Sequence, residues 1–207
     1  MKGVEELSDV RGGVGGGGCV TLARMALTLD RLREKLKEWK GCELAKGANP
    51  VLGEGNAKAD IVFIGEAPGQ KEDELGRPFV GPAGKFLDEL LASIGLQRRD
   101  VYITNIVKYR PPGNRDPEPS EKAACLPWVK LELALIRPKV ICTLGKHSLN
   151  EFFPKLSISK VHGEPQKVTK DFTVFPIYHP AAALHNGSLR GELFEDFRKL
   201  KEFLDRP

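Results

Sequence analysis

Hydrophobic residues follow two patterns along the chain, and the first predicts strands. Four short runs rich in β-branched and aromatic residues recur at positions 60–65, 100–105, 139–145 and 173–178, with the sequences DIVFIG, DVYITN, KVICTLG and TVFPIY. Each run is apolar at consecutive positions rather than at every second one, which is typical of strands that are covered on both faces.

The second pattern has helical spacing and fills the segments around these runs. One helix is expected from Thr28 to near Gly41, another is stopped by Gly95, a third is capped by Ser120 and runs to about Ile136, and a last one closes the chain. The positions that share a helical face are Leu29, Leu32, Leu36 and Trp39, then Phe86, Leu87, Leu90, Leu91 and Ile94, and finally Leu193, Phe197, Leu200 and Leu204. Strands that alternate with helices predict a three-layer α/β/α fold around a four-stranded parallel sheet.

This fold class predicts where a ligand binds before any chemistry is considered. In parallel sheets the ligand lies in the crevice at the carboxyl ends of the strands. The expected strands end at Gly65-Glu66, Thr104-Asn105, Gly145 and Tyr178-His179. Three chemically capable side chains, Glu66, Asn105 and His179, are therefore expected to converge on one crevice.

Length and composition limit the other possibilities. The chain has 207 residues and a net charge of +4, which suits one domain and leaves room for a local basic surface. We expect a flexible glycine-rich tail over 1–24 and a single domain over 25–207. There is no apolar run of the roughly 18 residues that a membrane span needs, so we expect a cytoplasmic protein. Four cysteines occur without a C-x-x-C pair, which argues against a zinc ribbon.

The loop after the first expected strand is rich in glycine and proline and reads GEAPGQKEDELGRPFVGPAG. Such a loop brings backbone close to a ligand. A phosphate is disfavoured, because Phe79 and Phe86 stand where a Walker loop needs its first glycine and its hydroxyl, and the dinucleotide pattern G-x-G-x-x-G is absent. Glu66 at the lip of the loop would also repel an anion.

The side chains expected at the crevice suit a flat heterocycle. Taken singly, a histidine near a strand end is more often structural, and an asparagine more often forms a turn. Together they offer an amide with one acceptor and two donors, and a neutral imidazole that can donate to an oxygen gaining negative charge. Glu66 can orient water, and Phe79 can be either a core residue or a wall on which a ring stacks. This set suits cleavage of a base from its sugar.

Several motifs in register carry a family resemblance. The segments GEAPG, GRPFVGPAGKFL, ITNIVKYRPPGNRDP and YHPAAAL resemble, in order and with similar spacing, the motifs of the family-4 uracil-DNA glycosylases of bacteria and archaea. The resemblance extends from about Trp39 to Leu204. It implies a uracil-DNA glycosylase-like fold and a DNA repair enzyme that flips uracil out of DNA and hydrolyses its N-glycosidic bond.

The resemblance also implies roles for individual residues. Phe79 becomes the stacking ring, Asn105 the uracil reader and His179 the donor to the departing uracil, while Glu66 is the carboxylate of the first motif. Gly65 and Ala67 flank that carboxylate and are expected to border the substrate. The general base stays open between Glu66, Glu72 and no strict base.

A DNA-binding rim is expected around this pocket. The resemblance places the segment from Pro111 to Asn114 along the DNA, and it places the loop from Ala181 to His185 in the gap left by the flipped nucleotide, with Leu184 as the apolar wedge. His185 stands where the family usually has arginine. Five basic residues fall on or near strand-end loops and are expected to form a basic rim that contacts phosphates: Arg77, Lys108, Arg110, Arg115 and Lys146.

The family's iron–sulfur cluster is not expected in this chain. Family-4 enzymes hold a [4Fe–4S] cluster on four cysteines, and the resemblance aligns Cys42 and Cys125 with two of them and Trp39 and Tyr109 with the others. Two thiolates do not complete the usual four-cysteine ligand set. We therefore predict no cofactor, with packing of Trp39 against Tyr109 in its place, and keep the cluster as the alternative.

Two other functions stay open at this point. The pocket could serve another damaged base such as hypoxanthine or thymine, because the small Ala67 leaves space beside the pyrimidine. The chain could also be a non-catalytic or covalently trapping uracil binder, although such relatives carry a basic insertion where this chain has KYRPPGNRDP. The expected partner is uracil-containing DNA, single-stranded or with U opposite G, bound by a monomer near the nucleoid, with a replication clamp or an abasic-site endonuclease as further partners.

Overall fold

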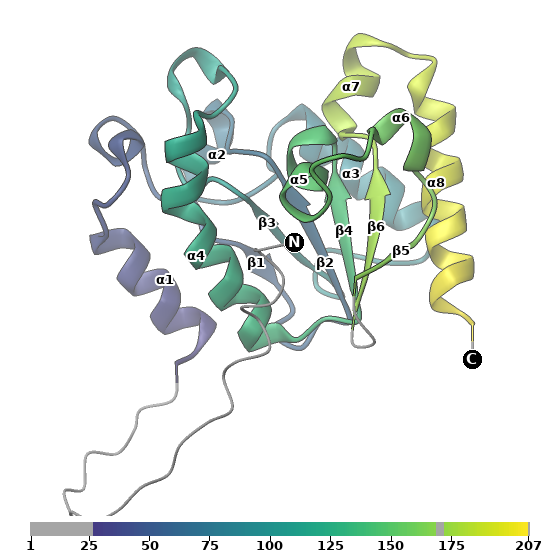
Figure 1. Cartoon of the computed structure of the whole chain (residues 1–207), viewed down its shortest axis with the longest axis horizontal. Coiled ribbons are helices and arrows are strands. Elements are labelled where there is room, and N and C mark those ends of the chain that lie inside the picture. Colours follow the sequence, from purple (N-terminus) through teal and green to yellow (C-terminus); the bar gives the residue numbers. More distant parts are fainter. Residues whose placement is uncertain (1–26, 169–171, 207) are drawn as a thin grey trace, which may run out of the picture.

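A mixed sheet forms the centre of the molecule in the computed structural model, which describes residues 27–168 and 172–206 (Figure 1). Its strands are ordered β1-β3-β2-β4-β6-β5. The bounds are Glu54–Gly55 for β1, Ile61–Gly65 for β2, Tyr102–Asn105 for β3, Val140–Leu144 for β4, Gln166–Lys167 for β5 and Thr173–Ile177 for β6. The expectations for the glycine-rich tail over 1–24 concern residues outside the described part of the chain.

The four predicted strands are confirmed, and they pair in parallel as β3-β2-β4-β6. The predicted four-stranded sheet is too small, however, because β1 and β5 add an antiparallel strand at each edge. Each edge strand has only two residues. A pair of residues carries no periodicity, so hydrophobic patterning could not reveal either one.

Helices cover both faces of the sheet, as the continuous apolar runs predicted. Alternate side chains of β2 point to opposite layers: Ile61 and Phe63 join a core with α3 and α8, while Val62 and Ile64 join a core with α4. The helices are α1 Leu29–Glu38, α2 Gln70–Leu75, α3 Pro82–Ser93, α4 Pro119–Ile136, α5 Lys146–Phe152, α6 Ile158–Val161, α7 Pro180–His185 and α8 Leu189–Leu204, with 3-10 turns η2 Glu43–Lys46 and η3 Pro112–Asn114. Figure 1 shows α1 and α4 on one side and α8 on the other.

The start of α4 differs from the prediction. Glu118, not Ser120, is the N-cap, and it forms a capping box with Glu121 while Pro119 occupies the first turn. A proline in the first turn has no N–H to leave unsatisfied, so it is favoured as the first helical residue. The helix therefore begins at Pro119, directly before Ser120.

The strand register brings the functional segments to one edge of the sheet. Gly65 pairs with Asn105, and Leu144 pairs with Ile177, so the carboxyl ends of β2, β3, β4 and β6 lie together. The loops that follow these strands therefore share one end of the molecule. Among the helices in the described part of the chain, none is long and apolar enough to cross a membrane.

Candidate active site

A cleft of about 430 Å³ opens at this edge of the sheet. Glu66, Asn105 and His179 all line it, so the convergence predicted from the strand ends is confirmed. The other lining residues are Ala67, Pro68, Gly69, Glu72, Phe79, Ala83, Pro111, Asn114, Arg115, Asp116, Ala181 and His185.

Asn105 forms the floor of the cleft at the end of β3. Its side chain is almost completely buried, and its Oδ1 has no hydrogen-bond partner among the described residues. A buried polar atom without a partner is costly and uncommon in native proteins, so it marks a position where a ligand completes the bonding. Gly65 makes this arrangement possible, because a Cβ there would lie 2.3 Å from Asn105 Oδ1 and 2.5 Å from Phe79 Cζ.

Phe79 lies beside the amide on a strained turn. Its φ of 52° is uncommon for an aromatic residue, so the surrounding contacts must hold it in place. Glu72 Oε1 accepts hydrogen bonds from the backbone N–H groups of Val80 (2.8 Å) and Gly81 (2.7 Å), directly after the turn. Arg98 donates to the carbonyl oxygen of Phe79 from the other side. Of the two acidic candidates for a general base, Glu72 is thus engaged by the backbone next to Phe79.

The ring of His179 stacks against that of Phe79, with centroids 5.7 Å apart and planes inclined by 29°. It is also the N-cap of α7, because its Nδ1 accepts a hydrogen bond from the backbone N–H of Ala181 at 3.1 Å. An accepting Nδ1 places the proton of a neutral ring on Nε2. Burial lowers the pKa of His179 to about 4. The residue is therefore a neutral N–H donor near neutral pH.

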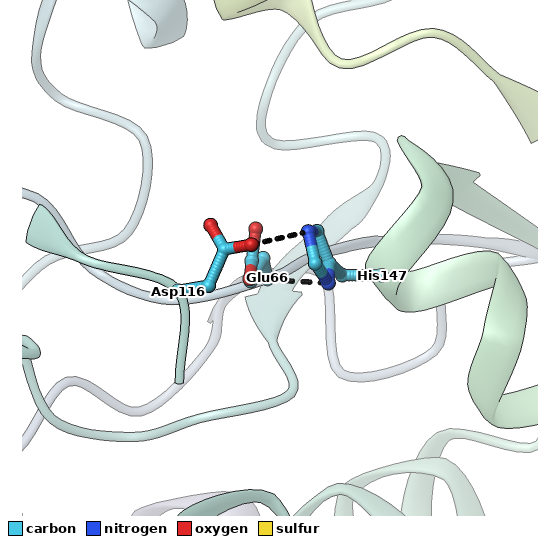
Figure 2. Close-up of side chains that lie close together, drawn as sticks. All are labelled: Glu66, Asp116 and His147. Atoms are coloured by element: carbon cyan, nitrogen blue, oxygen red, sulfur yellow. Dashed lines mark ion pairs between the residues drawn. The ribbon is translucent and has the colours of Figure 1, made fainter. Parts of the chain in front are cut away.

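Glu66 at the end of β2 belongs to a group of three ionisable side chains, which Figure 2 shows together with Asp116 and His147. Its Oε1 lies 3.4 Å from Nδ1 of His147, and Nε2 of His147 lies 3.2 Å from Oδ2 of Asp116. Burial, and then the negative charge of Asp116, raise the pKa of Glu66 to about 7. A carboxylate with that pKa can take up and release a proton near neutral pH.

Comparison with known proteins identifies the family. The model of the uracil DNA glycosylase superfamily matches residues 52–204 of the chain. The chain belongs to the uracil DNA glycosylase superfamily. It is 50% identical to the type-4 uracil-DNA glycosylase of Saccharolobus solfataricus over 186 aligned residues. These residues cover 85% of this chain and 86% of that protein. It is also similar to the type-4 enzymes of Sulfurisphaera tokodaii (47% identity; 87% and 86% covered) and Thermotoga maritima (44%; 86% and 95%).

The expected DNA-binding residues of this superfamily member lie in different environments. Pro111, Asn114, Arg115 and His185 line the cleft, whereas Lys146 is exposed at the start of α5. Arg110 lies at the edge of a neighbouring cleft, where its Nε donates to Asn114 Oδ1 at 2.7 Å. The segment expected to be a loop after His179 is instead the short helix α7, which carries the exposed Leu184.

Arg77 and Lys108, two further residues of the predicted basic rim, differ in their exposure. Arg77 is exposed, but both ends of its guanidinium group pair with the carboxylate of Glu54. Lys108 is wrongly predicted, because its side chain is completely buried. Its Nζ lies 2.7 Å from Glu132 Oε2 on α4 and also donates to Thr104 Oγ1 and to the backbone oxygen of Asn105.

Glu132 completes an inner network, which consists of Tyr102, Thr104, Lys108 and Glu132. Its carboxylate accepts hydrogen bonds from Tyr102 Oη at 3.0 Å, from Thr104 Oγ1 and from the backbone N–H of Gly53 at 2.9 Å. A buried ion pair is tolerated when such additional hydrogen bonds surround it. The network lies directly behind Asn105 and holds that residue's backbone through Lys108.

The positions aligned with cluster ligands do not fit a [4Fe–4S] cluster. The rings of Trp39 and Tyr109 stack with centroids 5.9 Å apart, and Tyr109 Oη donates to the backbone oxygen of Trp39 at 2.7 Å. Tyr109, Cys42 and Cys125 are all buried. Side chains without thiolates therefore fill half of the ligand positions, and they pack as a hydrophobic core rather than line a space.

Sequence reasoning missed two residues of the site, His147 and Asp116. A signal for His147 was present, because it comes only two residues after Gly145, where the third predicted strand ends. The rule that selected His179 at the end of the last strand applies equally there. Asp116 lies in the loop between η3 and α4, and its proximity to Glu66 depends on how that loop folds back over the sheet.

Proposed function

We propose that the chain excises uracil from DNA by hydrolysing the N-glycosidic bond of deoxyuridine and leaves an abasic site. The observation that carries this proposal is Asn105, a buried amide whose Oδ1 has no hydrogen-bond partner within residues 27–168 and 172–206 and faces a cleft wide enough for a base. Uracil presents an N3–H donor beside the O4 acceptor, which an amide matches with its oxygen and its NH₂ group. The type-4 glycosylase relatives support the same activity.

The remaining residues of the cleft have complementary roles in this reaction. Phe79 stacks on the flipped base, while Nε2–H of His179 donates to the uracil oxygen that gains negative charge as the N1–C1′ bond breaks. The electron pair leaves with uracil, and the oxygen of a water molecule bonds to C1′. Glu66 accepts the proton that this water loses. Glu72 positions Phe79 through the two backbone hydrogen bonds and is not the general base.

DNA contacts must offset the cost of turning the base out of the helix. That cost is about a few kcal/mol and is smallest where the base is mispaired or already unpaired. Arg115 and Asn114 at the cleft, Lys146 at the start of α5 and the exposed Leu184 on α7 are the side chains we assign to phosphates and to the vacated gap. A replication clamp, an abasic-site endonuclease and a nucleoid-associated location in the cytoplasm remain predictions that follow from this role.

The test is a uracil-release assay on a single-stranded oligonucleotide and on a U:G duplex. Free uracil together with an alkali-labile site is the expected result. Matched oligonucleotides with hypoxanthine or a T:G pair measure the substrate range. Release of hypoxanthine or thymine, but not of uracil, would show that the substrate is another damaged base. A denaturant-resistant protein–DNA adduct with no free base would show that the protein traps uracil-containing DNA covalently and does not excise the base.

We further propose that the chain works without a [4Fe–4S] cluster. Trp39 and Tyr109 stand at two of the four positions that the family's clusters use, and their stacked rings with the Tyr109 hydroxyl bond tie the end of α1 to the loop after β3. Iron analysis and the visible absorption of anaerobically purified protein test this proposal. We expect a colourless protein. Brown protein with about four irons per chain, the content of one such cluster, would overturn it.

A further inference from the structure

His147 links the candidate general base to the protein surface. The residue lies in the first turn of α5, directly behind the carboxyl end of β4, which pairs with β2 and therefore places α5 next to Glu66. Nδ1 faces Glu66 Oε1 at 3.4 Å and Nε2 faces Asp116 Oδ2 at 3.2 Å. Glu66 and His147 are largely buried, whereas 72% of the Asp116 side chain is exposed.

This arrangement suits a chain of proton transfers better than a metal site. Glu66, Asp116 and His147 each offer a ligand atom, and these atoms lie within 4.8 Å of one another. An imidazole, however, binds a metal through a single nitrogen, whereas here each ring nitrogen faces a different carboxylate, as the dashed lines in Figure 2 show. A ring with one nitrogen toward each carboxylate can accept a proton at Nδ1 and release one at Nε2.

Burial and two nearby lysines together disfavour a proton on the His147 ring. Lys122 on α4 places its Nζ 3.4 Å from Nδ1. Burial lowers the pKa of His147; Asp116 opposes that shift, while Lys122 and Lys146 add to it. The charge of His147 also contributes, after burial, to the low pKa of His179. A proton accepted from Glu66 therefore passes on rather than staying.

We propose that His147 is a relay residue that removes the proton taken up by Glu66 and delivers it through Asp116 to solvent. As the water oxygen bonds to C1′, its proton moves to Glu66 Oε1. Glu66 then donates to His147 Nδ1 while the Nε2 proton passes to Asp116, and the uracil anion takes a proton from solvent after release. His147 acts through Glu66 and does not contact the substrate. The proposal rests on the proposed function.

The 3.4 Å separation between Glu66 and His147 is long for a hydrogen bond, and Glu66 Oε1 has no hydrogen-bond partner among the described residues. Hydrogen bonds in active sites are often long in the free enzyme and shorten when the substrate binds. The relay therefore requires closure of this one contact. The contact from His147 to Asp116 is already 3.2 Å.

The test compares single-turnover uracil excision by the wild type, His147→Ala, Asp116→Asn and His162→Gln. General acid–base steps typically contribute 10²–10⁴-fold, and we expect loss of the relay alone to slow excision by about tenfold. Asp116→Asn should cause a smaller loss, because water can reach that exposed position. His162 is the matched control: it pairs with Asp196 at 3.0 Å, as His147 pairs with Asp116, but it does not line the cleft.

Chemical rescue separates a relay from a structural role. Added imidazole should restore excision by His147→Ala, and the restoration should increase with pH as free imidazole loses its proton, whereas pyrazole, which has the same shape but a weakly basic nitrogen, should restore little. Equal rescue by both compounds, or rescue by neither in a variant that melts like the wild type, would overturn the relay. If His147→Ala does not fold, His147→Gln replaces it in the comparison of rates, and a folded His147→Gln variant that excises uracil at the wild-type rate would overturn the relay.

A measurement that needs no DNA keeps this proposal separate from the proposed function. NMR titration of the His147 ring in the wild type and in Glu66→Gln reports whether the two groups share a proton. A titration of His147 that is unchanged in Glu66→Gln would overturn the relay even if uracil is released. Absence of uracil release by the wild type, with the titrations still coupled, would overturn the proposed function and, with it, the assignment of the relay to this reaction.

Discussion

Asn105 separates two polar regions that satisfy their hydrogen bonds in opposite ways. In front of it, in the cleft, its own Oδ1 and Glu66 Oε1 are buried without hydrogen-bond partners among the described residues. Behind it, in the inner network, Lys108 and Glu132 are equally buried, and the charged groups of both are fully engaged by protein partners. The two regions share the same strand, β3, and the same loop.

This difference indicates what each region does. Unpaired buried groups cost stability in the folded protein and are retained where a ligand pairs with them, whereas a fully satisfied buried network fixes a backbone in one position. The network therefore fixes the backbone of Asn105, while the Oδ1 of its side chain stays free at the cleft. Substitutions of cleft residues should therefore change the rate or specificity of excision more than the free energy of unfolding. Substitutions in the inner network should lower the free energy of unfolding first.

Asn105→Asp should give the largest effect and should act on specificity. The carboxylate replaces the amide donor by an acceptor, so it loses the bond to uracil O4 and can accept from the amino group of cytosine. A buried site can reject a substrate that leaves its polar groups unpaired by up to ~10⁴-fold. We expect a sharp loss of uracil excision and slow cytosine excision, measured as time courses on matched oligonucleotides beside a melting curve. A normally folded variant that removes uracil at the parental rate would show that Asn105 does not read the base.

Lys108→Met should give the largest effect on the other side of Asn105. Methionine keeps the volume but leaves the Glu132 carboxylate buried without its cation, and breaking a buried pair in this way typically costs about 3–5 kcal/mol. Denaturant unfolding measures the change in the free energy of unfolding. The control is Lys108→Met with Glu132→Gln, which removes the charge that was left unpaired and should recover part of the loss. If the double variant is less stable than the single one, the stranded charge is not the cause.

The residues behind Asn105 also show why part of the site could not be predicted from the sequence. The strands, their order of alternation with helices and the convergence of Glu66, Asn105 and His179 follow from local hydrophobic patterns and one topological rule. Lys108 was expected on the DNA-binding rim because a lysine after a strand end is normally solvated. Its burial depends on Glu132, which is 24 residues further along the chain on α4. No local pattern reports such a pairing.

His147 illustrates a different limit. Its place just after the third predicted strand makes it a candidate for the crevice, but the ring comes near Glu66 because β4 pairs with β2 rather than with β3. Strand order in a parallel sheet is set by long-range packing, which the runs of apolar residues do not encode individually. The two edge strands were missed for the same reason, since pairing with β3 and β6 defines them.

His179→Ala tests the cleft with an effect of intermediate size. A donor directed at charge that develops only in the transition state is typically worth ~10²–10³ in rate. We expect single-turnover excision to fall by that factor while affinity for a duplex with a non-cleavable uracil analogue is nearly unchanged. Because Nδ1 also caps α7, His179→Asn is the matched control: it can retain the cap but not the placement of the Nε2 donor. Equal losses of binding and rate would instead identify a folding role.

The pH dependence distinguishes Glu66 from His179, two of the ionisable residues that line the cleft. With a pKa raised to about 7, Glu66 is protonated below neutrality and becomes an ionised base above it, so excision should increase by about tenfold between pH 6 and pH 8. His179, whose pKa is lowered to about 4, stays neutral throughout that range and should add no further step. The Glu66→Gln variant should be slow and flat with pH. A wild-type rate that falls as pH rises would contradict Glu66 as the base.

Tyr109→Phe should have the smallest effect. It lies outside the cleft and should change only the free energy of unfolding. The substitution keeps the ring against Trp39 and removes the hydroxyl that donates to the backbone oxygens of Trp39 and Leu36 at 2.7 and 3.3 Å. A neutral hydrogen bond contributes about 1 kcal/mol, so the free energy of unfolding should fall by roughly that amount. Excision by the folded variant should match the wild type, because the ring and the inner network remain in place. A loss of excision without a loss of stability would mean that this region acts on the cleft directly, and the division of the two regions at Asn105 would then be wrong.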